Sequence, residues 1–200
     1  MTETSLVLAS ASKTRAALLQ NAGINVTCDP ANVDEDSVKI ALKGEGASAV
    51  QVAETLAELK AQAVSRRHPG VMVIGADQTL DCEGHWFDKP ENMDQARENL
   101  KFFRGKKHRL NAAVCIVKDG QRLWHVNDPA EMHVRDFSDE WLDWYLNTVG
   151  DEICDSVGGY RLEGPGSQLF ATVRGDYFTV LGLPLLPLMQ FLRGHKTILP

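Results

Sequence analysis

The sequence contains few cysteines and none of the spacings that cysteine-based sites use. Its four cysteines are far apart, with no C-x-x-C pair among them. This arrangement argues against both a structural zinc site and a redox dithiol. The six histidines are likewise scattered, at steps that suit no metal site. We therefore expect neither zinc nor dithiol chemistry, and a reduced, cytoplasmic location.

A long apolar run and an excess of positive charge are also missing. A helix needs roughly 20 apolar residues to cross a bilayer, whereas the nearest candidate, VLGLPLLPLMQFL, is broken by Pro184 and Pro187. The opening MTETSLVLAS has neither the positive flank nor the length of a signal peptide. The formal net charge of −6 disfavours a duplex-binding surface, although a local basic pocket can still hold one small anion. No membrane and no duplex nucleic acid are expected as partners.

What the sequence does have is an alternation of strand-like and helix-like segments along its 200 residues. This length fits one large domain or two small lobes that share a cleft. The predicted strands cover 5–9, 24–28, 71–76, two long strands within 108–134 that turn at Asp119-Gly120, and 169–173. The predicted helices cover about 10–23, 48–67, 92–103, 138–147 and 185 onwards. The fold class is therefore α/β with a mixed sheet.

The segment LASASKTR lies at the first junction between a strand and a helix. The free N–H groups and positive dipole end of a helix N-terminus bind phosphate, and the guanidinium of Arg15 can fork onto phosphate oxygens. Ser10 or Ser12 suits the helix cap, and both add hydroxyl donors. Taken alone, the segment is more commonly an ordinary capped helix with a surface arginine. The G-x-x-x-x-G-K pattern of a P-loop is absent.

Two further segments carry charge that suits a phosphate or metal site. In NVDEDS, Asp34, Glu35 and Asp36 offer oxygen ligands for Mg²⁺, but a solvated acidic loop is the more common reading of such a run. Lys60 falls on the apolar stripe of its predicted helix rather than opposite it. Such a lysine either extends along apolar surface to reach water or points inward at a phosphate.

Asp77 interrupts the apolar run VIGADQTL. We predict that it stands at the end of a central strand, where open α/β sheets place their ligands. A buried carboxylate there is costly unless it is paired, hydrated or metal-bound. The alternative is an aspartate that caps a turn at the strand end.

Two weaker candidates follow later in the chain. Lys89, in FDKP, precedes a proline that restricts its backbone, and its charge suits phosphate. Glu163 lies in the glycine-rich stretch VGGYRLEGPG, whose backbone permits close approach of a ligand. A plain irregular connection accounts for that stretch about as well.

Taken in order, LASASKTR, VDE, AELKA, IGADQ, DKP and RGDYFTVLGLPL resemble the Maf family of nucleoside triphosphate pyrophosphatases, from about residue 5 to residue 193. The resemblance implies a mixed central sheet flanked by helices, with a nucleotide cleft between two lobes, as in Maf and inosine triphosphate pyrophosphatase folds. It further implies a single Maf-like domain over residues 1–200, a cytoplasmic location and, in many members, a homodimer.

The activity that the resemblance implies is hydrolysis of a nucleoside triphosphate between its α- and β-phosphates, with Mg²⁺ or Mn²⁺. Asp77 takes the place of the proton acceptor, and Glu35 with Asp77 that of the metal ligands. The implied substrate-binding residues are Ser10, Thr14, Arg15, Lys60, Gln78, Lys89 and Glu163. An enzyme of broad specificity for standard nucleotides and a nucleotide-binding regulator of septum formation with little turnover remain alternatives.

Departures from the family pattern bear on the substrate. Gln78 after the aspartate and Glu163 in the late loop resemble the branch that acts on 7-methyl-GTP rather than the dTTP/UTP branch. A carboxylate accepts from the N–H groups of guanine, which favours a purine. Thr14, however, stands where the 7-methyl-GTP branch usually has an aromatic residue, so stacking on a methylated, cationic base is reduced. Only the second arginine of the common S-P-R-R is kept, as Arg15.

Overall fold

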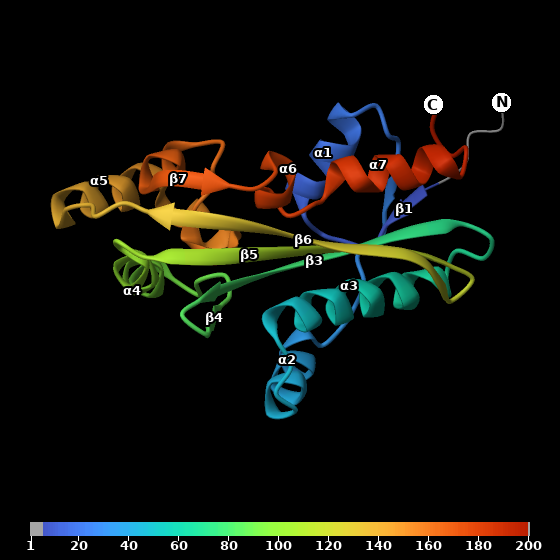
Figure 1. The fold of residues 1–200 in the computed structure, drawn as a ribbon, viewed down its shortest axis with the longest axis horizontal. Helices are drawn as coiled ribbons and strands as arrows, with labels where there is room; N and C mark the ends of the chain where they lie inside the picture. The colour runs from blue at the N-terminus through green and yellow to red at the C-terminus, as the bar shows by residue number, and fades with distance from the viewer. Residues whose placement is uncertain (1–5, 200) are drawn as a thin grey trace. The chain divides into compact units, whose positions relative to one another are not determined.

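The computed structural model describes residues 6–199 (Figure 1). Its strands are β1 Leu6–Leu8, β2 Thr27–Cys28, β3 Met72–Cys82, β4 His85–Phe87, β5 Lys107–Lys118, β6 Gln121–Val134 and β7 Phe170–Arg174. Its α-helices are α1 Lys13–Asn21, α2 Glu35–Gly44, α3 Ala49–Ser65, α4 Met93–Phe103, α5 Asp139–Val149, α6 Tyr177–Val180 and α7 Leu185–Gly194. Three 3₁₀ helices, η1 Gly150–Asp155, η2 Val157–Gly159 and η3 Pro165–Leu169, occupy the glycine-rich part of the chain.

The strands are ordered β2-β1-β3-β5-β6-β7, and β4 pairs with β3. β1 runs parallel to both β2 and β3, whereas the pairs β3–β4 and β6–β7 are antiparallel. The prediction of an α/β fold with a mixed sheet is therefore confirmed. The predicted turn at Asp119-Gly120 is also present, and both residues have positive φ, of 49° and 76°, as a two-residue hairpin turn requires.

The chain divides into two compact units. The first comprises residues 1–78, 112–128 and 177–200, and the second comprises 79–111 and 129–176. β3, β5 and β6 each contribute residues to both units. A single functional domain over 1–200, with a nucleotide cleft between lobes, stays a prediction.

The core of the first unit has two apolar layers, because successive strand residues face opposite sides. Leu6 and Leu8 pack in one layer with residues of α1 and α7, whereas Val7 packs in the other layer with alanines of α3. Figure 1 shows α1 and α7 on one side of the strands and α3 on the other. Small residues dominate the α3 layer, which allows this helix to approach the strands closely.

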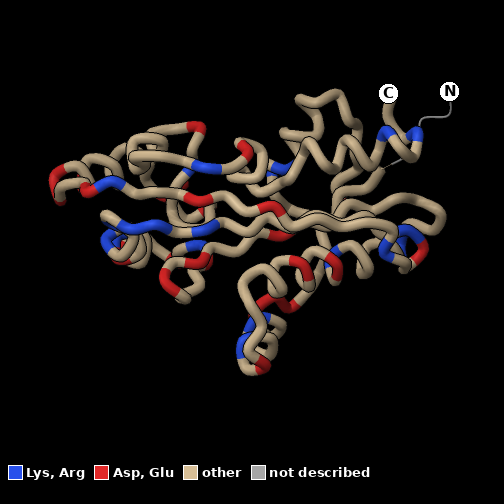
Figure 2. The backbone as a smooth tube through the Cα atoms, viewed as in Figure 1, with Lys and Arg blue, Asp and Glu red and all other residues tan. Residues whose placement is uncertain are grey.

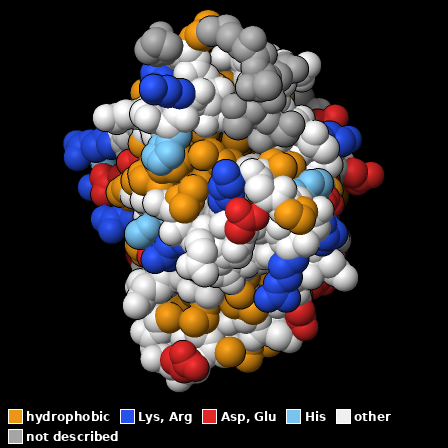
Figure 3. Space-filling model, turned by 90° about the vertical axis from the view of Figure 1, so that its right-hand side faces the viewer, with side chains coloured by type: hydrophobic (Ala, Val, Ile, Leu, Met, Phe, Trp, Pro, Cys, Tyr) orange, Lys and Arg blue, Asp and Glu red, His pale blue; other side chains and the backbone are white. Residues whose placement is uncertain are grey.

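The first layer is closed by aromatic rings near the end of α7. The rings of Trp124 and Phe191 stack with centroids 5.1 Å apart, and His195 stacks on Phe191 at 4.0 Å. Figure 3 looks at the side of the molecule where α7 ends and shows hydrophobic side chains reaching the surface between charged ones. Figure 2 shows acidic and basic residues interspersed along the described backbone.

The second unit has a core rich in aromatic rings. The rings of Phe87 and Phe103 lie 4.6 Å apart, and Phe103 contacts His108 at 5.0 Å. His108 Nε2 is 2.6 Å from the hydroxyl of Tyr160, and both residues are buried. Burial lowers the pKa of His108 to about 3, so its ring is neutral at ordinary pH.

Side-chain caps confirm most of the predicted helix starts. Ser12, Ser48, Asn92 and Ser138 each cap a helix by accepting from a backbone N–H one turn on. Ser48 also forms a full capping box with Gln51. The predicted first strand begins at Ser5, which lies outside the described residues, and the predicted strand 24–28 is reduced to Thr27–Cys28.

The prediction that NVDEDS is a solvated loop is correct for its exposure and wrong for its second half, which begins a helix. Asp34 accepts from the backbone N–H of Ser37 and thereby caps α2, and Glu35 is the first residue of that helix. Acidic residues favour this position because they complement the positive end of the helix dipole.

Candidate functional site

Asp77 lies within β3 and not at its end, contrary to the prediction. The last parallel pairing of β3 with β1 joins Ile74 to Leu8, and the first antiparallel pairing with β4 joins Leu80 to Phe87. Asp77 therefore stands past the end of β1, on a strand that continues beyond its parallel neighbour. This is still the carboxyl-end position, relative to β1, at which parallel sheets bind ligands.

The side chain of Lys60 points inward from α3 and meets two carboxylates. Its Nζ is 2.6 Å from Oδ1 of Asp77 and 2.8 Å from Oε1 of Glu35. Lys60 is 8% exposed and Asp77 is 6% exposed. Lys60 therefore points inward rather than along the surface, and its contact with a phosphate stays a prediction. The acidic start of α2, the middle of α3 and strand β3 thus converge on one ammonium group.

Gly75 explains how α3 comes near enough for this contact. A Cβ built on Gly75 would lie 2.1 Å from the carbonyl oxygen of Ala57 and 2.7 Å from Cβ of Ala61. Only a residue without a side chain permits the helix to pack at this distance. The glycine in IGADQ therefore serves the approach of α3, which carries Lys60 to Asp77.

Arg15 is anchored from α1 onto the same strand. Its Nη1 donates to the carbonyl of Ala76 at 3.0 Å and to Oγ of Ser10 at 3.2 Å. Its Nε donates to the carbonyl of Gly182 at 2.8 Å. Burial lowers the pKa of Arg15, and the charges of Asp77 and Glu35 oppose that shift. None of these three bonds uses Nη2, which carries two further N–H donors.

The pKa of Asp77 is raised, chiefly because burial penalises its charged form. The positive charges of Lys60 and Arg15 act in the opposite direction and lower the pKa of Asp77, which reduces the rise. A carboxyl with a raised pKa is a stronger base than an ordinary aspartate once it is ionised. The site therefore combines a basic carboxylate with the buried ammonium of Lys60 and the half-buried guanidinium of Arg15.

Sequence reasoning missed the residues that hold Gln78. Its amide nitrogen donates to the backbone carbonyls of Thr179, at 3.0 Å, and of Val180, at 3.3 Å. Thr179 in turn donates its hydroxyl to Asp128 of β6. The only signal available was the motif RGDYFTVLGLPL, which supported the family resemblance without pointing to a single residue within it.

The remaining predicted residues are placed as follows. Thr14 is half-buried in the first turn of α1. Lys89 and Glu163 belong to the second unit, and both are exposed. Glu163 lines a cavity of about 340 Å³ in that unit, together with Tyr145, Thr148, Val149, Glu152, Ile153, Ser156, Tyr160, Arg161, Gly164, Pro165 and Gly166. The roles of Thr14, Lys89 and Glu163 stay predictions.

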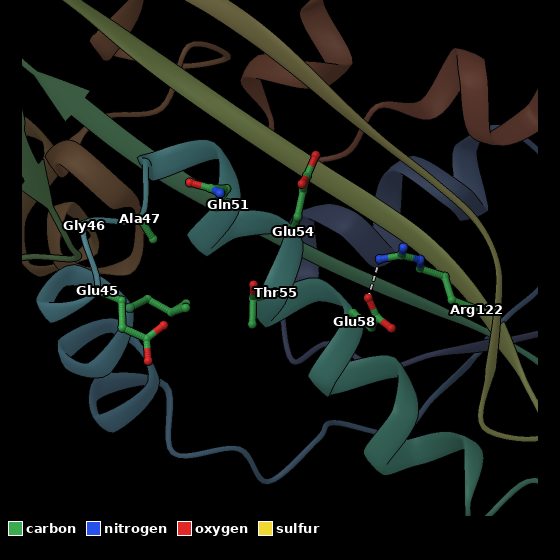
Figure 4. Close-up of a pocket in the computed structure, with 9 residues that line it drawn as sticks. Glu45, Gly46, Ala47, Gln51, Glu54, Thr55, Glu58 and Arg122 are labelled. Atoms are coloured by element: carbon green, nitrogen blue, oxygen red, sulfur yellow. Dashed lines mark hydrogen bonds and ion pairs between the residues drawn. The ribbon is translucent and has the colours of Figure 1, made fainter.

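A second cavity of about 340 Å³ lies in the first unit between α2 and α3 (Figure 4). Glu54 and Glu58 of α3 line it, with Glu45 from the loop between the helices, and Arg122 pairs with Glu58. None of the predicted site residues lines this cavity.

The described residues, 6–199, contain no group of three or more histidine, cysteine, aspartate or glutamate side chains placed to hold a metal ion. Glu35 and Asp77 are the two carboxylates that meet at Lys60. Over the same described range, no helix has the length and apolar character needed to cross a membrane.

Comparison with known proteins finds sequence relatives whose printed names describe nucleotide pyrophosphatases. A nucleoside triphosphate pyrophosphatase from Paramagnetospirillum magneticum is 53% identical, over 97% of this chain and 100% of its own length. A 7-methyl-GTP pyrophosphatase from Brucella suis is 49% identical, over 96% of this chain and 97% of its own length. A solved HAM1 protein from Coxiella burnetii has a TM-score of 0.42 and 12% identity, covering 66% of this chain and 74% of its own. Because the model of the family described as Maf-like protein matches residues 5–195 and the two relatives span nearly the whole chain, the protein belongs to the Maf-like family.

Proposed function

We propose that the protein is a nucleoside triphosphate pyrophosphatase, which hydrolyses the bond between the α- and β-phosphates and releases a nucleoside monophosphate and pyrophosphate. The observation that carries the proposal is the buried ammonium of Lys60 held between Glu35 and Asp77. Arg15 bonds to the backbone next to Asp77 and adds a second cation. The printed names of the relatives from Paramagnetospirillum magneticum and Brucella suis support the same activity.

The mechanism that we propose relies on placement and electrostatics rather than on a covalent intermediate. Arg15 and Lys60 neutralise the triphosphate, and Ser10 adds a hydroxyl. Asp77 orients the attacking water and accepts its proton. Lys60 is bonded to Oδ1 of Asp77, so Oδ2 is the oxygen that we assign to the water. The raised pKa of Asp77 increases its strength as that base.

A divalent cation, Mg²⁺ or Mn²⁺, fits the residues present. Mg²⁺ is typically held by one or two carboxylates together with substrate phosphates, rather than by a cage of protein ligands. Glu35 and Asp77 form such a pair, since both lie within 3 Å of the same Lys60 nitrogen. They would hold the ion, which when bound would neutralise negative charge on the phosphates.

We propose a guanine nucleotide, standard or 7-methylated, as the preferred substrate. Gln78 and Glu163 support this choice by their resemblance to the 7-methyl-GTP branch, and one relative carries that name. Thr14, in place of an aromatic residue, argues that stacking contributes less here than in that branch. A cytoplasmic location and a homodimer belong to the same proposal.

The experiment that tests this function supplies the purified protein with Mg²⁺ or Mn²⁺ and a panel of nucleotides: GTP, 7-methyl-GTP, ATP, CTP, UTP and dTTP. Products are separated and identified. We expect a monophosphate and pyrophosphate in equal amounts, fastest from a guanine nucleotide. Release of diphosphate and orthophosphate would contradict the proposed bond. Tight binding of nucleotide with negligible turnover would instead identify a regulator.

A further inference from the structure

Three backbone carbonyls of one short segment hold two side chains of the proposed site. The segment comprises residues 179–182, which are the last two residues of α6 and the two that follow it. The carbonyls of Thr179 and Val180 accept from the amide of Gln78, and the carbonyl of Gly182 accepts from Nε of Arg15. We call residues 179–182 the carbonyl segment. Its position therefore determines the orientation of both Arg15 and Gln78.

This arrangement decides which end of the Gln78 amide faces a ligand. An amide nitrogen carries two hydrogens, and here two carbonyls face it. The hydrogen-bond network assigns the nitrogen to the side of the two carbonyls, because a carbonyl oxygen requires a donor. Gln78 accordingly presents its oxygen, which accepts hydrogen bonds and donates none. A Cβ on Gly182 would lie 3.6 Å from that oxygen and 3.6 Å from Nη2 of Arg15, so both atoms border the same spot.

The carbonyl segment is itself held by the side chain of Asp128, which lies outside every predicted motif. The Thr179 residue is fully buried, and its hydroxyl donates to Oδ2 of Asp128, on β6. A hydrogen bond to a charged acceptor is about twice as strong as a neutral one. Asp128 thus fixes Thr179, the first residue of the carbonyl segment. The carbonyls of this segment accept from Gln78 at its start and from Arg15 at Gly182, its last residue.

We propose that Asp128 and Thr179 are positioning residues, which set the carbonyl segment so that Arg15 addresses phosphate and Gln78 offers an acceptor to a donor group of the nucleotide. The inference rests on the proposed pyrophosphatase activity and names the feature of the substrate that Gln78 selects: an N–H or O–H group. Neither Asp128 nor Thr179 contacts the substrate in this account. Both act through Gln78 and Arg15.

The test is a double-mutant cycle on kcat/KM for the best nucleotide of the panel. Its variants are Thr179→Val, Gln78→Ala and the double variant. Thr179→Val keeps the shape of the side chain and removes the hydroxyl, whereas Thr179→Ser keeps the hydroxyl and should restore activity. Thr172→Val makes the same chemical change on the exposed strand β7 and serves as the matched control. Thermal melting checks that each variant is folded.

We expect each single variant to lose about tenfold in kcat/KM, and the double variant to fall no more than about threefold below the worse single variant, because residues that act through one another are not additive. Thr179→Ser should stay within about threefold of wild type. Two results would overturn the inference: full activity in Thr179→Val, or a double variant whose loss is the product of the single losses. A merely structural role of Thr179 predicts that product.

Should Thr179→Val not fold, Asp128→Asn replaces it in the same cycle, since it keeps the side-chain shape and removes the charge. The same criterion of non-additivity with Gln78→Ala then decides. Failure of the positioning inference is distinct from failure of the proposed function. A wild type that releases no pyrophosphate from any nucleotide refutes the function, whereas an active wild type with multiplicative variants refutes only the positioning role.

Discussion

Nζ of Lys60 lies 2.6 Å from Oδ1 of Asp77, and both side chains are almost entirely shielded from water. A buried pair of this kind is favourable only while both partners are present, because a lone buried charge keeps its desolvation cost. Glu35 adds a second carboxylate to the same ammonium at its more exposed side. The contact between Lys60 and Asp77 therefore contributes to the stability of the fold and to the proposed reaction.

Lys60→Met is expected to destabilise the protein by roughly 3 kcal/mol, because it leaves the Asp77 carboxylate buried without its partner. Urea unfolding at pH 7 measures this loss. The double variant Lys60→Met/Asp77→Asn should recover part of it, since the uncompensated charge is gone. Lys101→Met, which removes an exposed ion pair with Glu98, is the matched control and should cost less than about 1 kcal/mol. Equal losses in the two lysine variants would contradict the buried pair.

Gly75→Ala is expected to disturb the packing of α3 on β3. The new Cβ would lie 2.1 Å from the carbonyl of Ala57, so helix and strand must separate. Overpacking of this kind costs roughly 1–3 kcal/mol, and we expect a loss near the upper end in chemical denaturation. The shift also moves Lys60 away from Asp77, so kcat/KM should fall with stability.

Gly44→Ala serves as the control for that substitution. Gly44 ends α2, has ordinary φ, and has no atom near its missing Cβ. Alanine favours the helix over glycine by up to about 1 kcal/mol, so this variant should be as stable as wild type or more so. A Gly75→Ala protein of undiminished stability would refute the close approach of α3.

His108 makes the stability of the protein fall with decreasing pH. Its folded-state pKa of about 3 lies below the ordinary value of 6.5, because burial disfavours the charged ring. The unfolded chain therefore binds a proton that the folded chain does not, so this contribution is fully present above pH 6.5 and is lost as the pH falls towards 3. Well below pH 6.5, the free energy of unfolding falls by about 1.4 kcal/mol for each pH unit from this group alone.

The measurement compares the free energy of unfolding of wild type and His108→Gln between pH 6.5 and pH 5. Glutamine cannot titrate, and it keeps a polar group near the hydroxyl of Tyr160. The decrease over this range should be roughly 1.5 kcal/mol smaller in the variant than in wild type. Identical pH dependence in the two proteins would show that His108 is not the titrating group.

Local patterns predicted the elements well where capping and periodicity agree. Ser12 was recognisable as a candidate cap because a short hydroxyl before a helix-like run is typical of an N-cap. NVDEDS was misread because an acidic run suits both a solvated loop and a helix start, and only the Asp34 contact distinguishes them. Asp77 was misplaced at a strand end because β3 continues past the end of β1, which no pattern in β3 itself reveals.

The composition of the site was partly predictable, and its connections were not. Arg15, Lys60 and Asp77 were singled out from charge in an apolar or helix-start context, and the structure brings them together in the first unit. Asp128 carried no signal, since an aspartate after an asparagine in a polar stretch is commonplace. Its contact with Thr179 joins residues 51 apart in the chain, and such a tertiary contact has no local signature.

The most direct test of the central claim is the rate of pyrophosphate release by Asp77→Asn, compared with wild type on the best nucleotide of the panel. Asparagine keeps the size of the side chain and cannot accept the proton of water. The affinity for a non-hydrolysable analogue, measured in parallel without added divalent cation because Asp77 is also a proposed metal ligand, reports whether the rest of the site remains intact. We predict a loss of about 10²–10⁴ in kcat with binding retained, the range that a general base contributes. A rate within about threefold of wild type would remove Asp77 from the reaction and contradict the account.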